Sequence, residues 1–302
     1  AGLSYVDLNG VVPNPRLSLV KEGIRIGRAE GVDFLLPIGG GSVIDTAKGI
    51  GYGIANDFEM EDLLYGCVKT DKNLPIGVVL TIAAAGSEMS SSMVLTIEDG
   101  MMKRSYGHDC ARPKFAIMNP ELTYSLPAYQ TASGAADIMM HTMDRYFNPY
   151  ENELTDAIAE ALLRTVIAKG RVAVQNPKDY DSMSELMWAG SLSHNGLTGL
   201  GGMKDFAVHQ LGHELSAMFD TAHGASLATV WGSWAKAVYQ TKPSRFARFA
   251  RNVWGIAEAD DTKAALSGID KTVAFFRSIG MPASLEENKD IGVQDDGILR
   301  DL

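Results

Sequence analysis

The sequence predicts an α/β domain over residues 1–127 and an all-helical domain over residues 128–302. In the first third of the chain, short β-rich apolar runs alternate with amphipathic helical stretches, which is the pattern of parallel βαβ units. From 133 to about 280 the periodicity is helical and strand signals are almost absent. The turn-forming residues Pro120 and Pro127 lie between these patterns and predict the boundary.

Hydrophobic patterning predicts the elements of the α/β part. Residues 17–30 carry Leu, Val and Ile at helical spacing among Lys and Arg, which predicts an amphipathic helix. Residues 32–38 (VDFLLPI) form a nearly continuous apolar run and predict a buried strand. Further elements in chain order are a helix over 42–55 and strands over 76–82, 93–97 and 115–118. Strands and helices that alternate in this way are typical of nucleotide-binding domains.

Composition and charge exclude several classes of protein. The 302 residues are 46% hydrophobic and 21% charged, which excludes a disordered or low-complexity chain and fits about two globular domains. The formal net charge of −10 argues against binding to nucleic acid or to an anionic membrane. Small molecules are therefore the expected partners.

Cysteine usage and hydropathy predict the location of the protein. Two cysteines, Cys67 and Cys110, are too few for a disulfide framework and fit a reducing compartment. No apolar run approaches the roughly 20 residues that a membrane span needs, and the first ten residues lack the pattern of a secretory leader. We therefore expect a cytoplasmic protein with no membrane span.

A glycine cluster, Gly39 to Ser42, follows the predicted strand 32–38 and opens the next helix. Glycines let the backbone approach a pyrophosphate closely, and the N–H groups and positive dipole end of the helix bind the anion. Neither GxGxxG nor GxxxxGK[ST] is matched, so a tight turn that needs glycine for its dihedral angles is the alternative. Under either interpretation, Ser42 is expected to cap the helix.

The histidines and one aspartate predict a metal site in the helical part. Asp137 and His141 are four residues apart in a helical pattern, and His209 and His213 repeat that offset, so each pair shares one helix face. His223 follows shortly after the second pair. A carboxylate and imidazoles that project from neighbouring helices into a bundle core form sites for first-row metals.

The alternative for each pair alone is a hydrogen-bonded core histidine, because such spacings occur by chance in many helices. Two pairs in otherwise apolar segments of one domain favour the metal site. His108 and His194 have no partner at such a spacing, and the sequence assigns them no role.

At these residues the chain resembles the iron-containing, or group III, alcohol dehydrogenases, and within them the butanol dehydrogenase branch. The motifs that carry the resemblance are PNP at 13–15, GGGSVIDTAKGI at 39–50, AAGSEMS at 84–90, TYSLPAYQTASGAADIMMH at 123–141 and DFAVHQLGHELSAMFDTAHG at 205–224. The resemblance implies the fold that this family shares with dehydroquinate synthase. An incomplete Rossmann-like domain binds NAD or NADP, and an all-α domain then binds one divalent metal.

By matching position, the resemblance also implies roles for individual residues. The implied metal ligands are Asp137, His141, His209 and His223. His213 is the implied catalytic, non-ligand histidine beside the substrate. The implied cofactor contacts are Asn14, Gly40, Gly41, Ser42, Asp45, Thr81 and Lys103. The metal would be Fe(II), with Zn(II) as the alternative. The protein could form a homodimer.

The chain also departs from the family pattern. Ala85 stands where the family commonly has Thr, which removes one hydroxyl near the cofactor. Family members begin with a further βαβ unit before the PNP segment and end with closing helices, so we expect a chain truncated at both ends. An unpaired sheet edge is expected where the first strands would lie.

The expected chemistry is hydride transfer between NAD(P)H and a short aliphatic aldehyde or alcohol. The metal would polarise the substrate oxygen, and His213 would relay the proton. One alternative is a truncated or degenerate fragment that binds metal but no dinucleotide. Another is a metal- and NAD-dependent lyase of the dehydroquinate synthase type, which would need more Lys and Arg beside the histidines than residues 130–225 supply.

Overall fold

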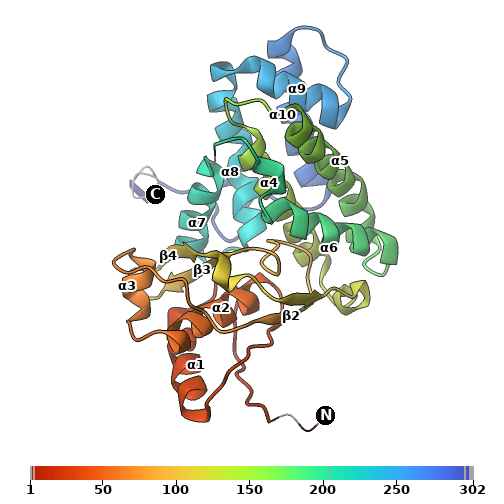
Figure 1. Ribbon diagram of the computed structural model, residues 1–302. Coiled ribbons are helices and arrows are strands. Elements are labelled where there is room, and N and C mark those ends of the chain that lie inside the picture. Colours follow the sequence, from red (N-terminus) through yellow and green to blue (C-terminus); the bar gives the residue numbers. More distant parts are fainter. Residues whose placement is uncertain (1, 3, 204, 296, 299–302) are drawn as a thin grey trace. The chain divides into compact units, whose positions relative to one another are not determined.

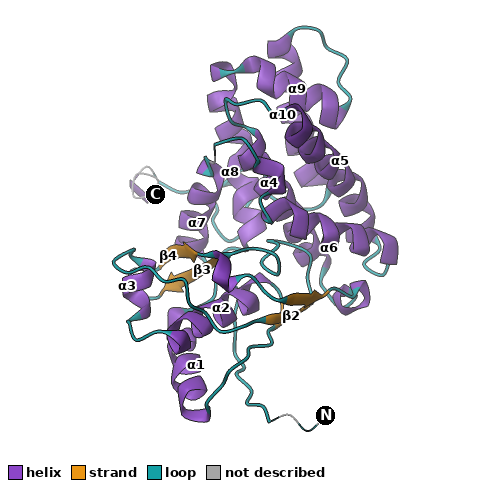
Figure 2. Ribbon diagram, viewed as in Figure 1, coloured by secondary structure: helices purple, strands orange, loops and turns teal. Residues whose placement is uncertain are grey.

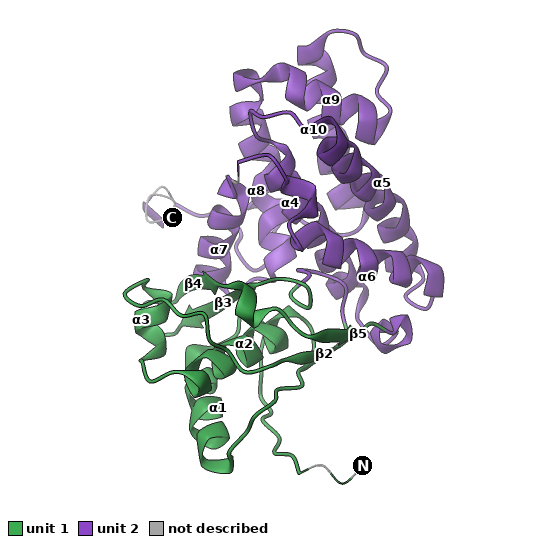
Figure 3. Cartoon of the chain, in the orientation of Figure 1, with its two compact units in different colours: residues 1–81, 87–118 green, residues 82–86, 119–302 purple. Residues whose placement is uncertain are grey.

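The helical and strand patterns of the sequence divide between two units in the computed structural model, which describes residues 2, 4–203, 205–295 and 297–298. Unit 1 comprises the described residues of 1–81 and 87–118, and unit 2 those of 82–86 and 119–302 (Figure 3). The short segment 82–86 therefore belongs to the helical unit, although it lies between two segments of unit 1 in the sequence.

Unit 1 is built on a small parallel sheet whose three strands are β1 (Ile38–Gly39), β2 (Gly77–Leu80) and β5 (Phe115–Ile117) (Figure 1). Their order in the sheet is β1-β2-β5, with Val79 paired to Ile38 on one side and to Ile117 on the other. The helices of this unit are α1 (Leu17–Glu30), α2 (Gly41–Ala55) and α3 (Met60–Leu64). Both predicted helices, 17–30 and 42–55, are confirmed to within one residue.

The predicted strand 32–38 is mostly wrong. Only Ile38 joins a ladder, and Leu35 makes an isolated bridge to Ile76. Pro37 lacks an N–H donor, so it offers only its carbonyl, which accepts from the N–H of Val79 at 3.0 Å. A proline inside the apolar run therefore limits the strand to two residues.

One face of the parallel sheet is exposed and apolar. It carries Phe34, Leu36, Ile38, Phe115 and Ile117, which are 41–63% exposed, and we call it the open sheet face. On the central strand β2, Val78 and Leu80 are buried, and α2 packs against β1. The sequence pattern predicted a buried strand, but the apolar residues of segment 32–38 are exposed on one face.

A second sheet of unit 1 is a hairpin of β3 (Ser92–Ile97) and β4 (Met102–Gly107), which pair antiparallel (Figure 2). The strand over 93–97 was predicted, but its partner was missed. The polar sequence of β4 alternates around the buried Lys103, and its turn places Gly100 and Met101 at positive φ. A turn followed by a polar edge strand leaves little hydrophobic signal.

The predicted capping role of Ser42 is wrong. Helix α2 begins at Gly41, and the capping position is Gly40, which has no side chain. Ser42 already lies inside the first turn, where its carbonyl accepts a hydrogen bond from the Thr46 hydroxyl at 2.8 Å. The glycine cluster thus extends the helix by one residue beyond the expected start.

Unit 2 is helical. Its longer helices are α4 (Ala128–Tyr146), α5 (Glu153–Gln175), α6 (Tyr180–His194), α7 (Ala207–Phe219), α8 (His223–Val238), α9 (Pro243–Trp254) and α10 (Asp261–Ser278). Helix α4 is buried from Thr131 to Tyr146 and packs against α5, α6, α7 and α8. None of the helices in the described ranges is long and apolar enough to cross a membrane.

Close backbone contacts hold α4 against its neighbours in unit 2. A Cβ at Gly134 would lie 2.1 Å from the carbonyl oxygen of Ala83, and one at Gly224 would lie 2.0 Å from that of Ser133. Real Cβ atoms essentially never approach within 3.0 Å, so only glycine fits at these two positions. Segment 82–86 and α8 therefore each pack directly on the backbone of α4.

Candidate metal centre

Helix α4 supplies the first two groups of the site. Asp137 and His141 lie one turn apart on the buried face, and their side chains are about 5% exposed. The distance from His141 Nε2 to Asp137 Oδ1 is 3.4 Å. The predicted i, i+4 pair therefore projects into the interior of unit 2.

Helices α7 and α8 bring two further histidines to the same carboxylate. The Nε2 atoms of His209 and His223 each lie 3.9 Å from Asp137 Oδ1. The chain turns sharply at Asp220, which has a positive φ and ends α7, so α8 begins at His223 only three residues later. This short connection returns the start of α8 to the level of His209.

The donor set and its geometry fit a divalent metal. One ligand atom from each of Asp137, His141 and His209 can be chosen so that all lie within 4.8 Å of one another. His209 Nε2 is buried and has no hydrogen-bond partner within the described part of the chain. A buried lone pair that faces a carboxylate and further imidazoles is what a first-row cation requires.

Burial lowers the pKa of His141 to well below its usual value, and the neighbouring His194 and His209 lower it further. This ring is therefore a neutral imidazole at physiological pH. A histidine must be neutral to donate a lone pair to a metal.

His213 lies beside two of the predicted ligands, His209 and His223. It is half-buried on α7, and its ring stacks on that of His223 with centroids 5.1 Å apart. The ring centroids of His213 and His209 are 6.2 Å apart. Its position thus leaves it next to the site and reachable from solvent.

The sequence assigned no role to His194, and the structure corrects this. His194 is the last residue of α6, and its ring stacks on His141 with centroids 4.0 Å apart. Its Nδ1 is hydrogen-bonded to the carbonyl oxygen of Ala85. Both residues that His194 contacts here are more than fifty residues away in the sequence, so no short spacing could indicate these contacts.

The predicted glycine loop lies at the carboxyl edge of the parallel sheet in unit 1. Gly40, Gly41 and Ser42 follow β1 directly and form the start of α2. Thr81 follows β2, and its N–H donates to the carbonyl of Gly39 at 3.2 Å. Ligands of open parallel sheets bind in this position, outside the carboxyl ends of the strands.

The other three predicted cofactor residues are engaged within unit 1. The two carboxylate oxygens of Asp45 accept from the Ser87 hydroxyl at 2.5 Å and from the N–H of Val94 at 2.9 Å. Burial raises the pKa of Asp45, and the charges of Lys48 and Lys103 oppose that rise. Lys103 is buried on β4.

Asn14 adopts a positive φ of 56° and is buried, and its carbonyl accepts from the Thr96 hydroxyl. The next residue, Pro15, accepts from the N–H of Thr96 at 2.8 Å. The PNP segment is therefore fixed against β3.

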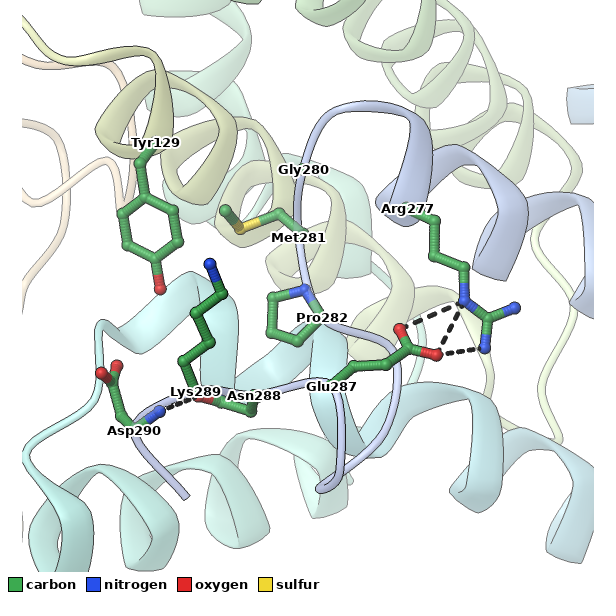
Figure 4. Close-up of a pocket in the computed structure, with 9 residues that line it drawn as sticks. All are labelled: Tyr129, Arg277, Gly280, Met281, Pro282, Glu287, Asn288, Lys289 and Asp290. Atoms are coloured by element: carbon green, nitrogen blue, oxygen red, sulfur yellow. Dashed lines mark hydrogen bonds and ion pairs between the residues drawn. The ribbon is translucent and has the colours of Figure 1, made fainter. Parts of the chain in front are cut away.

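A cavity of about 450 Å³ in unit 2 is lined by Tyr129, Arg277, Gly280, Met281, Pro282, Glu287, Asn288, Lys289 and Asp290 (Figure 4). Arg277 is bound to Glu287 at this cavity. None of the predicted site residues lines this cavity, so it is not the metal centre.

The sequence matches two family descriptions in succession. Residues 1–120 match "Iron-containing alcohol dehydrogenase", and residues 131–299 match "Fe-containing alcohol dehydrogenase family, C-terminal". The chain belongs to the iron-containing alcohol dehydrogenase family. The resemblance inferred from the motifs is thereby confirmed, as is the fold class.

Individual members of the family agree with this assignment. NADH-dependent butanol dehydrogenase A of Clostridium acetobutylicum is 41% identical, over 94% of this chain and 74% of the relative. NADPH-dependent aldehyde reductase YqhD of Escherichia coli is 34% identical, over 95% and 75%. The crystal structure of NADH-dependent butanol dehydrogenase A from Thermotoga maritima has a TM-score of 0.93 at 35% identity, over 95% and 72% of the two chains.

Proposed function

We propose that this chain is a metal-dependent alcohol dehydrogenase or aldehyde reductase. It would transfer a hydride between NAD(P)H and a short aliphatic aldehyde or alcohol. The observation that carries the proposal is the convergence of three imidazoles on one carboxylate oxygen, Asp137 Oδ1, in unit 2. Family relatives named butanol dehydrogenase and aldehyde reductase support the substrate class.

Asp137, His141, His209 and His223 would hold the metal, which we propose to be Fe(II), with Zn(II) as the alternative. A divalent metal bound there would supply Lewis acidity toward the substrate oxygen. The four residues would orient that oxygen, and the burial of Asp137, His141 and His209 would exclude most water from it. Residues 128–302 would form the metal-binding domain.

His213 is the residue that we propose to move the proton. It is half-buried and stacks on His223, so its ring can exchange a proton with solvent while it faces the centre. Residues 1–127 would hold the dinucleotide. Gly40, Gly41 and Ser42 would contact the pyrophosphate at the start of α2, with Asn14, Asp45, Thr81 and Lys103 as the remaining proposed cofactor contacts. Cytoplasmic location stays a prediction.

The decisive experiment is oxidation of NADH or NADPH on addition of butanal, with protein loaded anaerobically with Fe(II) or Zn(II). We expect metal-dependent oxidation with at least one pair of cofactor and metal. His209→Ala should lose both metal and activity, whereas His213→Ala should keep one metal per chain and lose most of its turnover at neutral pH. Retention of metal by the His209 variant would overturn the ligand assignment.

The same preparations test the two alternatives. A chain that binds metal but no dinucleotide would leave the fluorescence of NADH and NADPH unchanged on mixing. A lyase would bind NAD without net reduction of an added aldehyde. Either result would refute the proposed dehydrogenase.

A further inference from the structure

A second aspartate of α4 lies beside the predicted ligands. Asp144 is two turns beyond Asp137 and is buried, with 3% of the residue exposed. Its Oδ2 atom lies 2.5 Å from Nδ1 of His209 and 3.2 Å from the backbone nitrogen of the same residue. One carboxylate oxygen thus holds both the backbone and the ring of a single histidine.

These two contacts fix which nitrogen of His209 carries its hydrogen. The backbone N–H can only donate, so Oδ2 of Asp144 is an acceptor. A carboxylate oxygen has no hydrogen to donate, so the ring nitrogen Nδ1 donates to the same oxygen, and the neutral ring carries its lone pair on Nε2. That Nε2 is the atom that lies 3.9 Å from Asp137 Oδ1.

We propose that Asp144 is a positioning residue that orients the His209 ring, and fixes its tautomer, for binding of a divalent metal. The inference rests on the metal site of the proposed function. A ligand histidine that donates its other N–H to a carboxylate binds metal more tightly, and loss of such a partner costs about 10- to 100-fold in affinity.

The contact with the backbone also gives Asp144 a structural role. His209 is the third residue of α7, and the residue that precedes this helix provides no side-chain cap. Asp144 accepts the N–H of His209 and so caps α7 from a neighbouring helix. A test must therefore separate metal binding from the stability of the fold.

Asp144→Asn provides that separation. Asparagine caps helices about as well as aspartate, so its amide oxygen can still accept the backbone N–H. It lacks the charge that strengthens the bond to the imidazole. The measurement is the affinity for Co(II) and for Zn(II) by competition with a chromophoric chelator, without cofactor or substrate. The visible spectrum of the Co(II) protein and the melting temperature of the metal-free protein are recorded alongside.

We expect Asp144→Asn to bind both metals about 10- to 100-fold more weakly and to shift the Co(II) bands, with a small change in metal-free melting temperature. Asp144→Glu restores a carboxylate and should recover part of the affinity. It also serves if the Asn variant fails to fold. The matched control is Asp156→Asn on α5, a buried carboxylate bound to Arg245, which should lower the melting temperature and leave metal affinity unchanged.

An affinity of Asp144→Asn within twofold of the unaltered protein, with an unchanged Co(II) spectrum, would overturn the inference. If the unaltered protein itself binds neither metal, the proposed function fails. If it binds metal and reduces butanal while Asp144→Asn behaves identically, only the role of Asp144 fails.

Discussion

Replacing Gly224 by alanine should weaken metal binding by moving a helix rather than by removing a ligand. Gly224 follows His223 at the start of α8, and the new Cβ would lie 2.0 Å from the carbonyl oxygen of Ser133 on α4. Since real Cβ atoms essentially never come within 3.0 Å of such an atom, the two backbones must separate by at least 1 Å. Neither group is a flexible side-chain tip that could turn away.

The magnitude follows from the position of the contact. Ser133 is one turn from Asp137, so separation there lengthens the distance of 3.9 Å between His223 and Asp137. Overpacking of this kind costs about 1–3 kcal/mol. If metal binding must restore the original spacing, the affinity falls by about 5- to 150-fold. The melting temperature of the metal-free protein should fall by about 2–12 °C.

The assay is chelator competition with Zn(II) together with thermal melting of metal-free protein. The matched control is Gly232→Ala on the same helix, where the new Cβ would meet only the terminal methyl of the half-buried Val273 at 2.8 Å. Val273 lies on α10, which carries none of the proposed ligands, so the control should bind Zn(II) normally. Equal Zn(II) affinities for Gly224→Ala and the unaltered protein would refute the reasoning.

Two further predictions concern buried charges away from the metal centre. Arg245→Met removes the bidentate partner of the buried Asp156 carboxylate and leaves it only Arg248 at 3.5 Å, so it should cost about 3 kcal/mol, read by denaturant unfolding. The double variant with Asp156→Leu should regain most of that loss, and a double variant no more stable than the single one would contradict this. Burial lowers the pKa of Lys48 to about 8, against 10.5 when unfolded. The unfolded chain therefore binds more protons between these values, so the stability of the unaltered protein relative to Lys48→Met should rise from pH 8 to pH 10. A constant difference over that range would show that the pKa is not depressed.

Local periodicity was sufficient to predict which side chains share a helix face. The offset of four between Asp137 and His141 places both on one helix face whatever surrounds the helix, and the same offset does so for His209 and His213 on α7. His223 lies on another helix, and the resemblance to the family supplied it. The helices 17–30 and 42–55 were predictable for the same reason, because their signals are contained within one element.

Features that depend on tertiary contacts were missed. Asp144 and His194 act on histidines of other helices, or on segment 82–86, and sequence distance hides such contacts. The strand over 32–38 was predicted too long because the apolar run was taken as buried on both faces, whereas Pro37 shortens its pairing and one face is open. The prediction that Ser42 caps α2 failed because the helix begins one residue earlier and its capping position is Gly40, which has no side chain.

The open sheet face affects whether copies of this protein associate in solution. Five large apolar side chains, two of them the stacked rings of Phe34 and Phe115, attract any similar surface, and a net charge of −10 opposes close approach of two copies. Salt shortens the range of that repulsion to about 8 Å at 0.15 M and leaves the apolar attraction in place. We therefore expect dilute buffer to keep copies apart and concentrated salt to favour their association.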